Sequence, residues 1–154
     1  MKTSDVIVIG GGVVGASVAY FLAREGLSVT LFERDDLAAH ASGAAAGMLA
    51  PICESGGGGA LFDAGLRSLE LFPELTAELR EVSGVDPQYV QSGVLRVADT
   101  PAVAESFQAQ ASELSAYEVE WLDAAAARER EPHLADGVLG ALWSPREAHV
   151  YSPA

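Results

Sequence analysis

The sequence predicts an α/β fold that opens with a βαβ unit. After Asp5, residues 6–9 are an unbroken apolar run rich in β-branched side chains, and glycines follow at positions 10, 11, 12 and 15. From Val13 the apolar positions change from strand-like to helical spacing. After residue 84, short apolar segments alternate with helical ones, which is typical of a second, mixed α+β region.

Composition places limits on function. The chain has 154 residues, 49% hydrophobic, and a formal net charge of −13. This size and composition predict a folded chain with a substantial core. Its acidity argues against nucleic-acid binding, because phosphate backbones are repelled. The uncharged run 6–23 is best interpreted as a buried strand and helix, because glycines interrupt it and its period changes; we therefore predict no membrane association.

The single cysteine and the three histidines favour no reactive site. Cys53 cannot form an internal disulfide and lies beside Glu54, so we expect a small packed residue in a cytoplasmic protein. The histidines are scattered, without the spacing of metal ligands, and predict no metal site. They are His40, His133 and His149.

The first elements follow in order along the chain. Residues 5–9 predict a central parallel strand, buried on both faces. The helix that follows has apolar residues on one face: Val14, Val18, Phe21 and Leu22. Such a face is expected to pack on the sheet. Gly26 is placed to end the helix, and residues 27–32 predict a second strand that closes on Glu33.

Each motif glycine of this turn has a physical task in a Rossmann-like dinucleotide site. Gly10 allows a sharp turn out of the strand, Gly12 allows close approach of a pyrophosphate, and Gly15 allows tight helix packing. Glu33 lies at the end of the second strand, where a carboxylate accepts hydrogen bonds from ribose hydroxyls and disfavours the 2′-phosphate of NADP. This motif alone leaves FAD and NAD open.

The next segment reads His40-Ala-Ser-Gly-Ala-Ala-Ala-Gly-Met-Leu-Ala-Pro51. It resembles the loop after the second strand in the D-amino-acid oxidase superfamily, and most closely the glycine oxidase branch of thiamine biosynthesis. The resemblance implies FAD as the cofactor, with Ala41 and Ser42 near its phosphates and with 46–48 near the isoalloxazine ring. The predicted cofactor-binding residues are therefore Gly10, Gly12, Val13, Val14, Gly15, Glu33, Arg34, Ala41, Ser42, Ala46, Gly47 and Met48.

The remaining chain predicts a long helix and a small mixed region. A helix is expected over 61–83, with Pro73 as a kink or restart and Gly84 as its C-cap; its core candidates are Leu66, Leu69, Leu75 and Leu79. Strands are expected over 93–98, 118–122 and 138–143, helices over 102–116 and 124–131, and a turn over 144–147. Trp121 and Trp143 are expected in a core or an interface.

The resemblance also implies a domain plan. Residues 1–84 would be the N-terminal part of the FAD-binding domain, 85–150 part of an α+β substrate domain, and 151–154 a return to the first. Tyr151-Ser-Pro153 stands where the family usually has an acidic residue before proline. Family members are more than twice this long, so we expect an incomplete fold relative to the family and a chain that is inactive alone.

The function implied by the resemblance is oxidative deamination of a small amine or amino acid, with a hydride passing to flavin N5 and oxygen as the acceptor. No catalytic residue can be nominated within this chain. Two alternatives stay open: a non-catalytic FAD- or ADP-binding fragment, and an NAD-dependent oxidoreductase. Uncovered strand edges in a short sheet also predict association, so a homo-oligomer is one expectation.

Overall fold

The computed structural model describes residues 3–151. They fall into two compact units, one ending at Ala46 and one running from Gly47 to Tyr151. The predicted boundary after residue 84 divides the chain by family domain and stays a prediction. Of the segment predicted at 151–154, only Tyr151 lies within the described residues. None of the helices in residues 3–151 has the length and apolar character that a membrane crossing needs.

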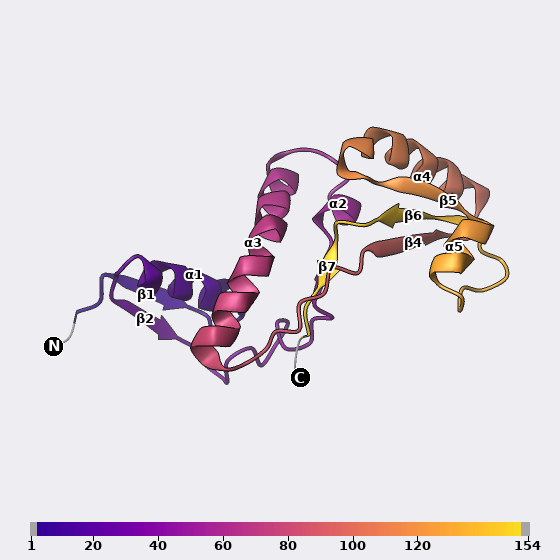
Figure 1. Ribbon diagram of the computed structural model, residues 1–154. Coiled ribbons are helices and arrows are strands. Elements are labelled where there is room, and N and C mark those ends of the chain that lie inside the picture. Colours follow the sequence, from indigo (N-terminus) through magenta and orange to yellow (C-terminus); the bar gives the residue numbers. More distant parts are fainter. Residues whose placement is uncertain (1–2, 152–154) are drawn as a thin grey trace. The chain divides into compact units, whose positions relative to one another are not determined.

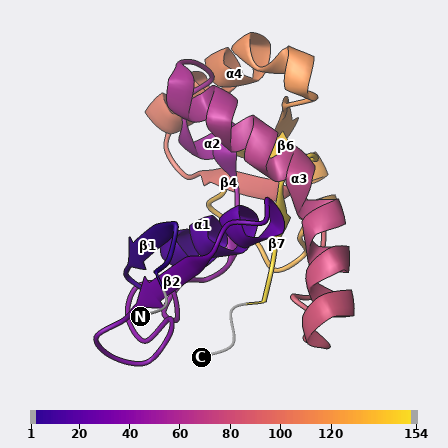
Figure 2. The same cartoon turned by 90° about the vertical axis from the view of Figure 1, so that its left-hand side faces the viewer.

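The first unit is the predicted βαβ motif (Figures 1 and 2). Strand β1 (Val6–Ile9) leads into helix α1 (Val13–Arg24) and then into strand β2 (Val29–Phe32). The two strands pair in parallel, with Val6 opposite Val29 and Ile9 opposite Phe32. A parallel pair requires a crossover connection, and α1 supplies it.

Burial in this unit differs from the prediction. Ile7 and Ile9 are 61% and 86% exposed, so β1 is not a strand buried on both faces. The helix face predicted to be core is also open, because Val14 is 75% exposed and Val18 45%. The physical reason is the small number of layers: a two-stranded sheet and one helix cover each other on one side only.

The second unit is built around the three-stranded antiparallel sheet β4-β6-β5. Its strands are β4 (Val94–Ala98), β5 (Glu120–Asp123) and β6 (Gly140–Ser144). Helix α4 (Pro101–Glu113) packs on one face, and helix α5 (Ala124–Arg130) contacts the other. Both helices begin at a side-chain cap, in which Thr100 accepts from the Val103 N–H and Asp123 from the Ala126 N–H.

The second unit also contains a separate two-stranded sheet, two more helices and a 3-10 turn. Strand β3 (Met48–Leu49) pairs with the late strand β7 (Ala148–His149) in antiparallel fashion. Helix α2 (Pro51–Glu54) follows β3, and helix α3 (Ala60–Ser83) packs against α2. A 3-10 turn over Ser115–Tyr117 extends the end of α4.

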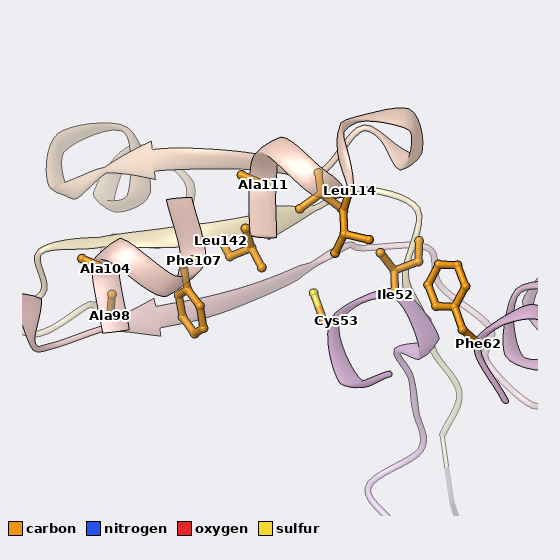
Figure 3. Close-up of a cluster of buried hydrophobic side chains, with 10 residues drawn as sticks. Ile52, Cys53, Phe62, Ala98, Ala104, Phe107, Ala111, Leu114 and Leu142 are labelled. Carbon is orange, nitrogen blue, oxygen red and sulfur yellow. The ribbon is translucent and has the colours of Figure 1, made fainter. Parts of the chain in front are cut away.

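The largest core lies in the second unit (Figure 3). It joins α2 and α3 to the α4 face of the sheet, with Ile52 of α2 beside Phe62 of α3 in the close-up. Its buried members are Ile52, Cys53, Phe62, Ala98, Ala104, Phe107, Ala111, Leu114, Val119 and Leu142. Trp121 packs against this cluster, and Trp143 packs against a smaller one around α5, as expected for core residues.

Most predicted elements are present, with shifted ends. Gly26 and Gly84 follow their helices with φ of 85° and 73°, as predicted. Helix α3 continues through Pro73 without a restart. The strand expected at 118 begins at Glu120 instead, because Glu118 ends the 3-10 turn with φ of 65°. Leu69 is buried as predicted, whereas Leu66, Leu75 and Leu79 are only half-buried.

Candidate nucleotide-binding site

The glycine turn between β1 and α1 forms a surface without side chains. A Cβ on Gly15 would overlap the carbonyl oxygen of Gly10 and would lie 3.4 Å from Val8 Cγ1, so only glycine allows α1 to lie this close to the strand. A Cβ on Gly12 would lie 2.9 Å from Ser42 Oγ. The turn therefore packs against strand β1 on one side and against the loop that contains Ser42 on another.

The start of α1 is suited to an anion. The first N–H groups of a helix have no partner within it, and its N-terminal end carries partial positive charge. No acidic residue occupies the first turn of α1. Val13 N–H donates to Ser42 Oγ at 2.9 Å. This bond brings the segment around Ser42, predicted to lie near the phosphates, to the start of α1.

Glu33 forms the second half of this arrangement. Its Oε2 accepts from Gly11 N–H at 2.6 Å, and its Oε1 accepts from Arg34 N–H at 2.6 Å and from Asp35 N–H at 3.0 Å. These three backbone donors lower the pKa of the Glu33 carboxyl from its ordinary 4.5, the Asp35 bond most strongly. Glu33 is thus held ionised beside the glycine turn, with lone pairs left for hydroxyl donors.

Gly11 is a site residue that the sequence reasoning missed. It is buried, its N–H holds the Glu33 carboxylate, and a Cβ there would lie 3.1 Å from the Glu33 Cβ. In the motif this position is unspecified, so the spacing of the other glycines carried no signal for it. The run of three consecutive glycines was the available clue.

Arg34, also predicted to bind the cofactor, is paired with the acidic residue that follows it. Its guanidinium pairs with Asp35 at 3.1 Å, and Asp35 also lies 2.9 Å from His40 Nε2. All three side chains are well exposed, and exposed ion pairs contribute little to stability. The structure therefore ties the chain after β2 to the following loop through surface contacts.

The three residues predicted near the flavin ring lie where the first unit ends and the second begins. Ala46 closes the first unit and is exposed. Gly47 has φ of 79°, its carbonyl accepts from Val150 N–H at 2.9 Å, and a Cβ on it would overlap the Val150 carbonyl oxygen. Met48, in β3 opposite His149, is 59% exposed and available for contact.

Cys53 is a packed residue, as predicted, with 4% of its surface exposed. Burial, followed by the hydrogen-bonding and charge of Glu147, raises the pKa of its thiol to about 12. The thiol is therefore neutral at physiological pH, as is typical of a buried structural cysteine. Within residues 3–151, no group of three or more His, Cys, Asp or Glu side chains is arranged to hold a metal ion.

Comparisons with known proteins agree over nearly the whole chain. The sequence model of a family described as "DAO: FAD dependent oxidoreductase" matches residues 5–154. Glycine oxidase of Bacillus licheniformis is 36% identical over 150 residues, which are 97% of this chain and 40% of that protein. The bifunctional protein ThiO/ThiG of a Nostoc species is 36% identical over 154 residues, 99% of this chain and 23% of that one.

A solved structure gives the same picture. The crystal structure of glycine oxidase from Geobacillus kaustophilus matches with a TM-score of 0.93 at 35% identity, and the match covers 97% of this chain and 41% of that chain. The chain thus spans about 40% of the length of the curated glycine oxidases that it matches.

Proposed function

Because this chain belongs to the DAO family of FAD-dependent oxidoreductases, we propose that its first unit binds the adenosine diphosphate part of FAD. The observation that carries the proposal is the joint placement of three features. A side-chain-free turn at Gly12, the N-terminal end of α1 and the ionised Glu33 lie together in one unit. This is the arrangement that a pyrophosphate followed by a ribose requires.

The residues present fit that group. The turn has no side chain at Gly12, and the N-terminal end of α1 suits the pyrophosphate. Glu33 would accept hydrogen bonds from the ribose hydroxyls while its three backbone donors keep it in place. Ser42, which already holds Val13 N–H, would border the phosphates.

In the whole protein we propose oxidation of a small amine or amino acid. Bound FAD supplies a two-electron oxidant for a Cα–H bond, which no side chain can supply. Overall, the amine loses two electrons and two protons to become an imine, dioxygen takes them up as hydrogen peroxide, and water hydrolyses the imine to a carbonyl compound and ammonia. The contribution of this chain is to bind and orient the cofactor.

The finer assignments come from the sequence and its relatives. We propose that Ala46, Gly47 and Met48 lie near the isoalloxazine ring, because their small or polarisable side chains leave room for a flat ring. A cytoplasmic location, a role in thiamine biosynthesis and a homo-oligomeric state are proposals of the same kind. No catalytic side chain is assigned within residues 3–151.

A titration of the 154-residue chain tests the proposal. FAD and ADP are added separately, and binding is followed by flavin absorbance and by calorimetry, with NAD as the competing cofactor. We expect saturable binding of FAD and ADP and much weaker binding of NAD. In Gly12→Val, both affinities should fall at least about tenfold, because the new side chain meets Ser42 Oγ and stands where we propose that the pyrophosphate approaches the backbone.

Gly58→Val is the matched control, because nothing lies within 4 Å of a Cβ at Gly58. It should bind like the wild type. Binding of ADP without FAD would favour a fragment that holds only the adenosine half, and preference for NAD would favour a nicotinamide-dependent oxidoreductase. Equal affinity in Gly12→Val and the wild type would remove the glycine turn from the site.

A further inference from the structure

The backbone of Cys53 is held from both sides by charged side chains of the sheet region. Glu147 Oε1 accepts from Cys53 N–H at 2.8 Å, and an Nη of Arg96 donates to the Cys53 carbonyl at 2.8 Å. Arg96 lies on β4 and Glu147 lies between β6 and β7, so neither belongs to the segment that they hold. Glu147 and Cys53 are 94 positions apart in the sequence.

The two charged side chains differ in burial, and Arg96 is only half-buried. Glu147 is fully buried, and its Oε2 and the buried Ser144 Oγ have no hydrogen-bond partner among the described residues. The Arg96 guanidinium lies 4.6 Å above the ring of Phe107 and also donates to Gln110 Oε1. Burying a carboxylate costs free energy unless the carboxylate makes hydrogen bonds or ion pairs. Here the bond it makes is to the backbone of Cys53.

The two bonds to Cys53 matter because they hold the short helix α2, which follows strand β3. Cys53 is the third residue of α2, whose N-terminal N–H groups receive no side-chain cap from Ala50. Glu147 therefore caps this short helix from a distance, and its negative charge suits the helix N-terminus. The other end of the segment is fixed at Gly47, which bonds to Val150. Residues 47–54 are thus attached to the end of the sheet region at both ends.

We infer that Glu147, together with Arg96, is a positioning pair that fixes the conformation of residues 47–54. The inference rests on the proposed function for its consequence: this segment includes Gly47 and Met48, proposed to lie near the flavin ring. The pair acts through the backbone of Cys53. Its loss loosens the ring-proximal segment while leaving the adenosine site of the first unit intact.

The first test needs no cofactor. Hydrogen–deuterium exchange of peptides covering residues 48–54 is compared in the wild-type chain, Glu147→Leu and Glu147→Gln. Glu147→Leu should raise exchange in these peptides at least about tenfold, because it removes the acceptor of a charge-assisted bond. Glu147→Gln keeps an oxygen acceptor and should restore protection to within about threefold of the wild type. Peptides of residues 5–33 should be unchanged.

Two further variants make this test decisive. Glu120→Gln removes a carboxylate from the same unit, but that side chain is exposed and pairs only weakly with Arg130 at 3.5 Å. It should leave exchange at 48–54 unchanged. If circular dichroism shows that Glu147→Leu is unfolded, Arg96→Met carries the test, because it leaves Glu147 in place and removes the donor to the Cys53 carbonyl. If residues 48–54 exchange no faster in Arg96→Met and Glu147→Leu than in Glu120→Gln, the inference is overturned.

The second test separates positioning from general stability. FAD and ADP titrations are repeated with Glu147→Leu and Glu147→Gln. We expect an altered flavin absorbance spectrum and a lowered ratio of FAD to ADP affinity in the leucine variant, an unchanged ADP affinity, and recovery in the glutamine variant. Raised exchange with an unchanged spectrum and ratio would overturn the positioning role. A wild-type chain that binds no FAD would instead reject the proposed function, while the exchange result still decides whether the pair fixes the segment.

Discussion

At the scale of single residues, Glu33 has two tasks that share one carboxylate. Its oxygens accept three backbone N–H groups from Gly11, Arg34 and Asp35, and we propose that they also accept from the ribose hydroxyls. The same contacts that shape the loop after β2 therefore keep the carboxylate ionised. Replacing Glu33 removes an anchor of the loop as well as a ligand, so a cofactor-free measurement is needed to separate the two effects.

The lowered pKa of Glu33 predicts a pH-dependent contribution to folding. Because the folded-state pKa lies below the ordinary value of 4.5, the contribution is present above 4.5 and is lost as pH falls through the folded-state value. Glu33→Gln should therefore be less stable than the wild type at pH 7, and the difference should shrink in acid below 4.5. Urea unfolding of both chains at a series of pH values, without cofactor, measures it.

The change with pH in the stability difference between the wild type and Glu33→Gln tests this prediction. A gap between wild type and Glu33→Gln that stays constant from neutral pH to well below the ordinary carboxyl pKa would mean that the carboxylate charge contributes nothing. The hydrogen bonds would then act equally well with a neutral acceptor. A gap that widens in acid would contradict the direction of the pKa shift itself.

At the scale of elements, one face of helix α3 packs in the core of the second unit and holds the helix there. Phe62 is 2% exposed, meets the edge of the Tyr117 ring with centroids 5.2 Å apart, and belongs to the main core. The neighbouring Leu61 is 79% exposed. Adjacent helical positions point in directions about 100° apart, so the two side chains have opposite environments on the same turn.

Replacing Phe62 or Leu61 by alanine should change the free energy of unfolding by very different amounts. Phe62→Ala should lower the free energy of unfolding by about 3–5 kcal/mol, because it removes a large buried side chain and leaves a cavity between α2, α3 and α4. Leu61→Ala should change it by less than about 0.5 kcal/mol. Chemical denaturation followed by tryptophan fluorescence reports on this unit, since both tryptophans lie in it. Equal effects would mean that α3 does not pack as described.

At the scale of the whole molecule, the first unit presents apolar side chains to solvent. Ile7, Ile9 and Phe32 are 61%, 86% and 57% exposed. Ile9 and Phe32 are direct partners in the β1–β2 register, and Ile7 lies two residues along the same strand face. Contiguous exposed apolar surface of this kind favours association.

We expect the 154-residue chain to self-associate through this face. In size-exclusion chromatography with light scattering, the apparent mass should rise with protein concentration. Ile9→Ser should weaken association about tenfold, in line with the loss of one large buried apolar side chain at an interface. The control is Leu61→Ser, which removes a similarly exposed side chain from the other unit. A monomeric wild type at all concentrations, or equal effects of the two variants, would contradict the prediction.

What the sequence by itself determined was local. The strand, glycine turn and helix of residues 6–24, the cap at Gly84 and most elements of the mixed region follow from periodicity and turn chemistry within short windows, whereas strand β7 was not predicted. The segment 40–51 also determined the family, because its residues are distinctive without any knowledge of their contacts. These features depend on neighbours in sequence, where backbone sterics and capping act.

The tertiary structure alone decided which distant groups meet. Nothing near Cys53 in sequence indicates that Glu147 would hold its N–H, and the motif gave no sign that Gly11 would hold Glu33. Burial of Phe62 and exposure of Val14 likewise depend on which layers are present to cover each face. A helical or strand pattern specifies which residues share a face, but only the packing of other elements decides whether that face is buried, because burial is a property of the assembled layers.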